Sequence, residues 1–319
     1  MEIKIPDKYA GRPLRDFLHW ELKVSAKLLA RLKRDENGIM IGGRKVTVRY
    51  ILSAGDTLTL TDYPEESGTF IAPVDLPVEI VYEDECLLVA DKPPNMPTHP
   101  SHDHYDDTLA NALAFRQRDS AIPYVFRPIS RLDRDTSGLV TVAKTKYAAS
   151  RMSFLMKQGG FEKLYFALLD GVLPQEHGLI DAPLHRTAAS IITREVCSPD
   201  TPDAEPAQTV YRLLYTDGRY SLVLARPLTG RTHQLRVHFS HLGSPILGDT
   251  LYGRPNPIIG RQALHAAGLK FIHPISGLPV LLYSMPPDDF MQAAKQLFRA
   301  DTEKILSDIL NKWRQDEKV

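Results

Sequence analysis

The chain has 319 residues, 43% hydrophobic and 24% charged, which is typical of a soluble globular protein with room for about two domains. Its two cysteines, Cys86 and Cys197, are too few for a disulfide framework, and the N-terminus lacks the apolar run of a signal peptide. We therefore expect a cytoplasmic protein with no membrane segment. The formal net charge of +0 hides a basic segment, because residues 1–61 hold 12 Lys and Arg against 7 Asp and Glu, whereas residues 62–110 hold 1 against 12.

The first 61 residues predict a small α+β unit. Apolar residues recur at helical spacing over residues 11–22 and again over 26–38, with Ser25 as the expected N-cap of the second helix. "IMI", a Gly42–Gly43 turn and residues 45–60 then predict short strands. Two basic helices followed by a small sheet resemble the S4-type RNA-binding module. The basic residues expected to contact RNA are Lys27, Arg31, Lys33, Arg34, Arg44 and Lys45, and a merely solvated helix face is the alternative interpretation.

A low-complexity segment separates this unit from the rest of the chain. Residues 62–75 are rich in Pro, Gly, Ser and acidic residues, which predicts a linker. The strand that follows meets "YEDE", which we interpret as a solvated hairpin turn, and a second strand. A helix is then expected with Asp107 or Thr108 as its N-cap.

The remainder, 76–319, predicts a single α+β catalytic domain. Hairpin-rich strands with interspersed helices favour a mostly antiparallel mixed sheet with flanking helices, preceded by the small S4-like unit. Thr232 is expected to cap a helix that Gly243 ends. The other predicted elements are a strand at 139–145, a helix at 146–159, a strand at 162–173, two strands around the Asp217–Gly218 turn and one amphipathic helix over 288–313.

One polar cluster, "HPSHDHYDD" at residues 99–107, contains residue types that bind metals. Its His-x-x-His-Asp-His spacing differs from the His-x-His-x-Asp-His of metallo-β-lactamase-type hydrolases. His233, His238 and His241 could add ligands, but no His-Glu-x-x-His spacing accompanies them. We therefore predict no metal, and keep a metal-dependent hydrolase as an alternative.

A second polar cluster, "RLDRDTSG", places Asp133 just before a turn that leads into an apolar strand. Arg131 and Arg134 lie beside it. A carboxylate held by arginine stays ionised, which suits a nucleophile or a base. Taken alone, the stretch could equally be an ion pair at the end of a strand.

Longer sequence motifs distinguish between these two interpretations. "YEDECLLVADKP", "RLDRDTSG", "EKLYFALLDG", "GRTHQLRVHFSHLGSPILGDTLYG" and "LHAAGLKFIHPISG" occur in this order and resemble the RluA family of RNA pseudouridine synthases, from about Leu76 to about Pro287. The resemblance implies an isomerase that converts specific uridines of ribosomal or transfer RNA to pseudouridine. It implies no cofactor and no metal, and we expect a monomer. A catalytically idle RNA-binding or ribosome-assembly factor on the same fold is the alternative.

The resemblance also assigns roles to individual residues. Asp133 matches the family's catalytic aspartate, Arg236 the arginine that pairs with it, and Tyr165 the tyrosine that lies against the uracil ring. Arg131 matches the residue that takes the space vacated by the extruded base. Further RNA contacts are expected from Lys92, His99, Arg231, His233 and Gln234.

One position departs from the family pattern. The family usually has His-Arg-Leu-Asp where this chain has Ser130 before Arg131. A serine retains one hydrogen-bond donor but lacks the contacts of an imidazole ring. The departure concerns the contact with the substrate loop and leaves the catalytic residues in place.

Overall fold

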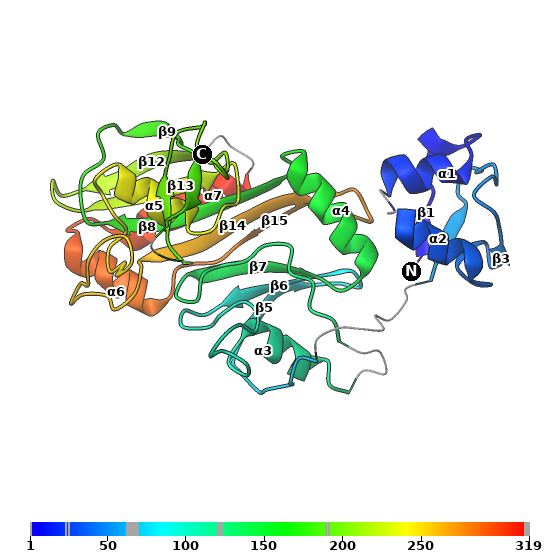
Figure 1. The fold of residues 1–319 in the computed structure, drawn as a ribbon, viewed down its shortest axis with the longest axis horizontal. Coiled ribbons are helices and arrows are strands. Elements are labelled where there is room, and N and C mark those ends of the chain that lie inside the picture. The colour runs from blue at the N-terminus through cyan, green and yellow to red at the C-terminus, as the bar shows by residue number, and fades with distance from the viewer. Residues whose placement is uncertain are drawn as a thin grey trace.

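The computed structural model describes residues 2–22, 24, 26–61, 70–119, 124–188, 190 and 192–315. Ser25, the expected N-cap, lies outside these residues. An N-terminal unit and a larger unit built on a nine-stranded sheet make up the described chain (Figure 1). None of its helices is long and apolar enough to span a lipid bilayer.

The N-terminal unit, residues 2–61, has its own four-stranded antiparallel sheet with the strand order β1–β4–β2–β3. Its hydrophobic core includes Leu14, Phe17 and Leu18, which are fully buried, as their helical spacing predicts. Gly42 and Gly43 both have positive φ and form the predicted turn. The elements are β1 (Glu2–Lys4), η1 (Asp7–Tyr9), α1 (Leu14–Asp16), η2 (Phe17–Glu21), α2 (Ala26–Arg34), β2 (Ile39–Ile41), β3 (Arg44–Lys45) and β4 (Thr57–Leu60).

The strands predicted over 45–60 form only at the two ends of that range. Between β3 and β4 the backbone turns back to the start of the first helix, where the Leu14 amide donates to the Tyr50 carbonyl and the Arg15 amide to the Val48 carbonyl. These bonds satisfy amides at a helix N-terminus that have no partner inside the helix. The alternating apolar residues therefore dock against a helix instead of extending the sheet.

The helix α4 (Lys146–Lys157) lies between the N-terminal unit and the large sheet (Figure 1). Tyr147 of α4 is buried and joins the hydrophobic core of the N-terminal unit. Arg151, one turn further on, pairs with Glu21 at 3.4 Å. The two units are thus in direct contact through one face of α4.

The large sheet has the strand order β5–β6–β7–β14–β8–β13–β12–β9, and β15 pairs with β14. Its pairs are antiparallel except for β7 and β14, which run parallel, so the sheet is mixed and mostly antiparallel as predicted. The elements are β5 (Glu79–Glu83), β6 (Leu87–Lys92), β7 (Ser137–Ala143), β8 (Phe161–Leu169), β9 (His177–Asp181), β12 (Gln208–Thr216), β13 (Ser221–Pro227), β14 (Leu264–Ile272) and β15 (Pro279–Tyr283).

The parallel pair is a short junction between two antiparallel halves of the sheet. Its register joins His265 to Ser137 and Ala266 to Gly138. Gly138 has φ +112°, and a Cβ atom there would lie 2.3 Å from the Ala266 carbonyl oxygen. Only glycine fits this position, because it has both the required backbone freedom and no side chain.

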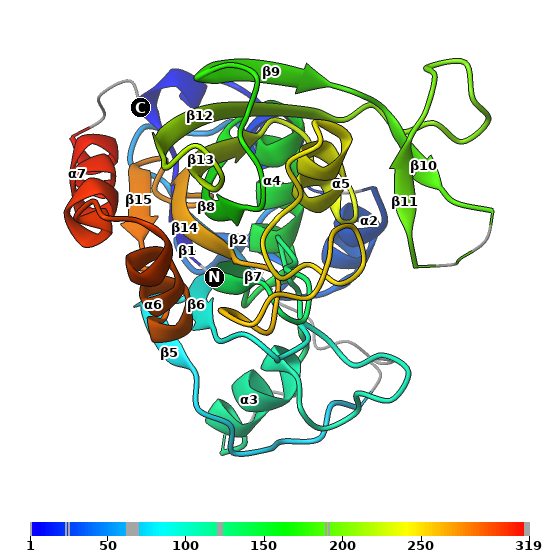
Figure 2. The ribbon, with the colours of Figure 1, turned by 90° about the vertical axis from the view of Figure 1, so that its left-hand side faces the viewer.

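Helices cover both faces of the sheet. Leu88 and Ala90 of β6 contribute to the same core as α3 (Leu109–Arg116), whereas Leu87 and Val89, on the alternate face, contribute to the core under α4. Two more strands, β10 (Leu184–Arg186) and β11 (Arg194–Val196), form a hairpin that projects from the body of the protein (Figure 2). The remaining helices are α5 (Gln234–His241), α6 (Asp288–Leu297) and α7 (Thr302–Arg314).

Three details differ from, or sharpen, the sequence predictions. Thr108 is the N-cap of α3 and makes a reciprocal capping box with Asn111. The end of the predicted linker is held by the same asparagine, whose Nδ2 donates to the Ala72 carbonyl at 2.8 Å. The single helix predicted over 288–313 is in fact α6 and α7, because Asp301 caps a new helix by accepting from the Lys304 amide.

Candidate active site

A cleft of about 810 Å³ lies where the loop before β7, the strand β8 and the loop before α5 meet. Asp133 and Arg131 enter it from the first loop, Tyr165 from β8, and Arg236 from α5. These four residues come from three separate segments, and Asp133 and Arg236 are 103 positions apart in the sequence. The fold therefore gathers at one place the side chains that the family motifs single out.

The Asp133 loop is fixed by the segment that follows β6. The Thr98 hydroxyl donates to the Leu132 carbonyl at 2.8 Å and accepts from the Leu132 amide at 3.2 Å. The Met96 amide donates to the Arg134 carbonyl at 3.1 Å. Thr98 and Leu132 are both buried. The backbone on each side of Asp133 is therefore held before any substrate arrives.

Lys92, a predicted RNA contact, is fully buried instead. Its Nζ donates to the carbonyl oxygens of Pro93, at 2.8 Å, and Arg134, at 2.9 Å. Burial lowers the pKa of Lys92 to about 7, although the nearby charge of Asp135 opposes the shift. The prediction of an RNA contact is wrong for this residue, because its amine is buried and donates to two carbonyls that hold the Asp133 loop.

Arg236 connects Asp133 to a second carboxylate. Its Nη1 lies 3.1 Å from Asp133 Oδ2, while Nε and Nη2 donate to the two oxygens of Asp249 at 2.7 and 2.8 Å. Burial alone would lower the pKa of Arg236, but the hydrogen bonds to Asp249 and Asp133 raise it above its ordinary value. Arg236 is thus a fixed cation that orients the Asp133 carboxylate in the cleft.

Asp249 is a residue of the site that its sequence context did not single out. Its side chain is fully buried, and it also accepts from the amides of Leu251 and Tyr252 at 2.9 and 3.1 Å. Burial opposes its ionisation, but the hydrogen bonds from Arg236 and these amides lower its pKa. A buried arginine needs this compensation. Asp249 lies in the "LGDTLYG" motif, but the motif alone does not show that Asp249 pairs with Arg236.

His233 lies on the other side of the Asp133 carboxylate, with Nε2 3.9 Å from Oδ1. Its Nδ1 is 2.8 Å from the hydroxyl of Tyr252, which also accepts the Arg194 amide at 2.9 Å. Burial, with a contribution from Arg236, lowers the pKa of His233. His233 has φ 58° and precedes α5 without a side-chain cap bond, so it takes the N-cap position that was predicted for Thr232.

Tyr165 and Arg131 differ sharply in exposure. The Tyr165 ring is 6% exposed on β8, and burial, reinforced by the charge of Asp133, raises the pKa of its hydroxyl. Arg131 is exposed at the mouth of the cleft, and it makes no hydrogen bond or ion pair with any residue that the structure describes. Tyr165 is therefore a fixed aromatic surface inside the cleft, and Arg131 is a free cation at its entrance.

Two other expected RNA contacts lie along the cleft. His99 is an exposed residue of the cleft lining, and partial desolvation together with the charge of Arg131 lowers its pKa. Arg231 lies at the mouth, where it is paired with Glu205 at 3.0 Å. Both side chains remain in positions from which a nucleic acid could be contacted.

Gln234 does not fit its predicted role in RNA binding. It is 4% exposed, and its Nε2 donates to the Gln208 carbonyl and the Thr209 hydroxyl. Its Oε1 accepts from the Thr229 hydroxyl and the Arg231 amide. All of its hydrogen-bonding capacity is used inside the fold, so the prediction is corrected to a structural role in the loop before α5.

Ser130, the position that departs from the family pattern, points inward. It is 6% exposed, and its hydroxyl accepts from the Thr141 amide of β7 at 3.4 Å. The serine therefore contacts the sheet beneath the Asp133 loop.

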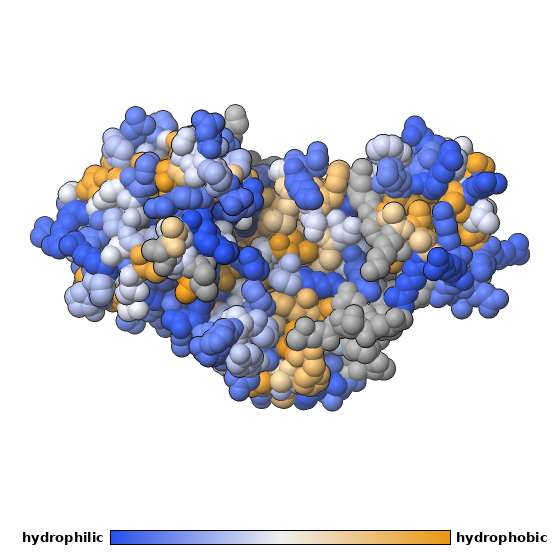
Figure 3. Space-filling model, viewed as in Figure 1, coloured by the Kyte–Doolittle hydropathy of each residue, from blue (hydrophilic) through white to orange (hydrophobic). Residues whose placement is uncertain are grey.

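Basic residues of the N-terminal unit are mostly on its surface. Hydrophilic residues border much of the outer edge of this unit in Figure 3. Arg31 is partly buried, and the Lys27 side chain lies outside the described part of the structure. The exposed members of the predicted set are Lys33, Arg34, Arg44 and Lys45.

The histidine loop at 99–107 does not gather metal ligands. His102 is exposed beside Asp103, and His104 Nδ1 bonds instead to Asp107 at 2.6 Å. Elsewhere, His238 is buried and bonded to the Thr209 hydroxyl and the Ala182 carbonyl. In the described ranges, three potential ligands converge only at a different place.

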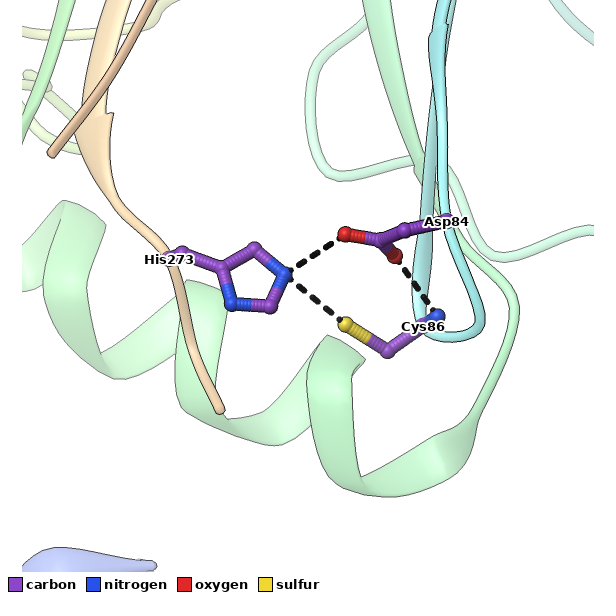
Figure 4. A group of neighbouring side chains, drawn as sticks. All are labelled: Asp84, Cys86 and His273. Carbon is purple, nitrogen blue, oxygen red and sulfur yellow. Dashed lines mark hydrogen bonds and ion pairs between the residues drawn. The ribbon is translucent and has the colours of Figure 1, made fainter. Parts of the chain in front are cut away.

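That place is formed by Asp84, Cys86 and His273 (Figure 4). His273 Nε2 lies 2.8 Å from Asp84 Oδ2 and 3.2 Å from Cys86 Sγ. The Ser276 amide donates to Nδ1 of the same ring at 3.0 Å. In a neutral imidazole, Nε2 then carries the proton and has no lone pair for a metal. The cluster is a hydrogen-bonded support for the turn, and Asp84 in "YEDE" is accordingly not a freely solvated carboxylate.

Comparison with known proteins agrees with this geometry. The sequence model of the RNA pseudouridylate synthase family matches residues 86–241. An uncharacterised RNA pseudouridine synthase of Bacillus subtilis, YjbO, is 39% identical over 278 residues, which cover 86% of this chain and 96% of the relative. The chain belongs to the RluA family of RNA pseudouridine synthases. The resemblance seen in the motifs is thereby confirmed, and the protein is an RNA pseudouridine synthase.

Two further comparisons cover most of this synthase's length and its fold. Ribosomal large subunit pseudouridine synthase D of Zymomonas mobilis is 36% identical over 305 residues, covering 88% of this chain and 95% of the relative. The solved structure of human RNA pseudouridylate synthase domain containing 1 has a TM-score of 0.56 and 29% identity, covering 74% of this chain and 95% of that one. The α+β fold predicted from the sequence is confirmed.

Proposed function

We propose that this synthase converts uridine to pseudouridine in large-subunit ribosomal RNA, with Asp133 as the essential carboxylate. The observation that carries the assignment of Asp133 is its ion pair with Arg236, whose Nε and Nη2 donate to the buried Asp249. The choice of RNA is supported by the name of the Zymomonas mobilis relative, which is a ribosomal large subunit enzyme. Transfer RNA is the alternative substrate.

The reaction is an isomerisation in which all atoms are conserved. The bond between C1′ of the ribose and N1 of uracil breaks, and the electron pair leaves with the base. A bond between C1′ and C5 forms after the base turns, C5 loses its proton, and N1 gains one. Asp133 is the group available as nucleophile or base in the cleft, and Tyr165 supplies a face on which the uracil can lie while it turns.

Entry of the base requires its extrusion from the RNA stack, which costs about a few kcal/mol. Arg131 is proposed to fill the vacated space, because it is exposed at the mouth and its planar guanidinium can stack on neighbouring bases.

We further propose that residues 1–61 are an S4-like RNA-binding module, that 62–75 link it to a catalytic domain at 76–319, and that the enzyme acts as a cytoplasmic monomer.

A pseudouridine map of total RNA tests the proposal. Ribosomal RNA from a strain lacking the gene should lose at least one pseudouridine that the parent strain contains. Re-expression of the wild-type chain should restore the site, and Asp133→Asn should not. The Asn variant should still bind the RNA, because the substitution leaves the cationic residues of the cleft in place.

Asp135→Asn provides a matched control two residues away. Its carboxylate also lines the cleft but pairs with Arg134 at 3.1 Å, so this variant should restore the site. Restoration by Asp133→Asn to the wild-type level would contradict the role of Asp133. A lost site confined to transfer RNA would contradict the proposed substrate and leave the reaction intact.

A further inference from the structure

Lys163 lies inside the cleft and has no role in the reaction as described so far. It is on β8 two residues before Tyr165, and both side chains line the cleft. Residues two apart on a strand face the same side and are separated by roughly 7 Å. A Cβ atom on Gly230 would lie 3.8 Å from Lys163 Nζ, so the amine is next to a position that has no side chain. Lys163 is therefore an immediate neighbour of the proposed uracil platform.

The charge of Lys163 is uncompensated, unlike that of most cations around it. Arg134 pairs with Asp135, Arg231 with Glu205, and Arg236 with two carboxylates. Lys163 Nζ has no hydrogen-bond or ion-pair partner among the residues that the structure describes. Burial lowers the pKa of Lys163 to about 8, so the amine is still mainly protonated at neutral pH. A partly buried cation with no anion is costly unless the substrate supplies one.

We propose that Lys163 is a catalytic residue that stabilises the negative charge on the uracil while it is detached from the ribose. This inference rests on the proposed function, since it requires the uracil to lie against Tyr165. When the bond from C1′ to N1 breaks, the electron pair remains on the base and is shared by N1 and the ring carbonyl oxygens. Formation of the bond from C1′ to C5, loss of the C5 proton and protonation of N1 then remove that charge.

An RNA phosphate is a weaker candidate for the anion. Phosphates are charged throughout the reaction and strongly hydrated, and the exposed Arg131 and partly exposed Arg231 already offer cations at the mouth. The uracil must enter the cleft in any case, and its charge arises there. A preorganised cation at the place where charge develops accelerates the chemical step, whereas a phosphate contact would strengthen binding in all states equally.

The two possibilities separate in single-turnover kinetics. The probe is ribosomal RNA isolated from a strain lacking the gene and labelled with tritium at C5 of uridine, and the signal is tritium release. With enzyme at saturating concentration, Lys163→Met should slow the reaction by about 10²-fold, which is the scale for removing one preorganised electrostatic group. Lys163→Arg retains the charge, so its rate should be at least about tenfold higher than that of Lys163→Met.

Binding is measured by filter retention with each substitution placed in the Asp133→Asn background, so that no reaction occurs. The matched control is Lys295→Met, which removes an equal charge from the exposed face of α6, away from the cleft. Both variants should change the dissociation constant by no more than about threefold, as expected for loss of at most one weak ionic contact. Thermal melting checks that both variants are folded.

A normal single-turnover rate for Lys163→Met, with weaker binding, would overturn the inference and assign Lys163 to a phosphate. An equal loss of rate in Lys295→Met would also overturn it, by showing a general charge effect. Absence of tritium release from the wild-type enzyme would remove the proposed function itself, and with it this role for Lys163. The three results are distinguishable within one experiment.

Discussion

The cleft and the helix α2 both carry cations that we propose contact RNA, but the fold supports them in different ways. In the cleft, Arg236 is fixed by three hydrogen bonds to two carboxylates, and the loop that carries Asp133 is held by buried Lys92. On α2, Lys33 and Arg34 are exposed. Chemistry requires groups held in one geometry, whereas attraction of a phosphate backbone requires only charge at the surface. Substitutions in the two regions should therefore fail in different ways.

The largest effect is expected at Asp249. Asp249→Asn removes one charge from a buried pair, so Arg236 is left with Asp133 as its only carboxylate and can shift toward it. We expect the single-turnover rate to fall by about 10²-fold, since small displacements of catalytic groups have effects of this size. The free energy of unfolding should fall by about 3–5 kcal/mol, the usual cost of breaking a buried ion pair. Tritium release and urea denaturation measure the two quantities.

Asp170→Asn is the matched control for this substitution. Asp170 also pairs with an arginine, Arg254, at 2.7 Å, but that arginine is exposed and lies outside the cleft. Its loss should cost less stability than the loss of Asp249, because Arg254 stays solvated without a partner, and the rate should be unchanged. Equal effects of the two substitutions would show that the buried pair has no special role in the site.

An intermediate effect is expected at Lys92, and it should depend on pH. Lys92→Met removes the Lys92 donor from the carbonyls of Pro93 and Arg134 and leaves the Arg134 carbonyl with the Met96 amide, which should lower the free energy of unfolding by about 1–3 kcal/mol. The folded chain has a pKa of about 7 for Lys92 in place of 10.5, so between these pH values the unfolded chain binds more protons. The stability of the wild-type protein relative to the variant should therefore rise from pH 7 to pH 9.

Urea denaturation of both proteins at these two pH values tests the prediction, with Lys295→Met as a control whose exposed amine should show no such difference. A stability difference between wild type and Lys92→Met that is identical at pH 7 and pH 9 would argue against a buried amine with a lowered pKa.

The smallest effect is expected on α2. Replacement of Lys33 and Arg34 by Gln removes two exposed charges, and should weaken RNA binding by about tenfold at low salt. The magnitude of the slope of log affinity against log salt concentration should fall by about 2, because each lost phosphate contact lowers it by about one unit. The rate at saturating enzyme should be unchanged. If affinity and salt dependence both stay at wild-type values, these residues are a solvated helix face, the alternative that the sequence left open.

The sequence predicted those parts of the enzyme that local patterns determine. Periodicity and capping located α3 with Asp107 or Thr108 as its N-cap, and the resemblance to the RluA family assigned Asp133, Tyr165 and Arg236 to one site before any geometry was available. It did not predict the environment of long polar side chains. Lys92 and Gln234 have residue types that favour a surface, and only tertiary structure shows that carbonyl and hydroxyl groups surround them.

Two other differences have the same origin. Residues 46–56 have the alternation of a strand, but the unpaired amides at the start of α1 provide competing partners for their backbone. Asp249 is an ordinary acidic residue in the sequence, and its importance arises from the burial of Arg236 beside it. In both instances, the group that determines the local structure is distant along the chain.

The short parallel junction in the sheet affects how precisely Asp133 and Tyr165 are positioned relative to each other. Asp133 precedes β7, on one side of the junction, whereas Tyr165 belongs to β8, on the other. Any rotation of one half of the sheet against the other would alter the alignment of the carboxylate with the aromatic ring. Gly138 allows the halves to approach within a distance that a methyl group would prevent. Gly138 does not line the cleft, yet it sets how closely the segments that carry Asp133 and Tyr165 approach each other.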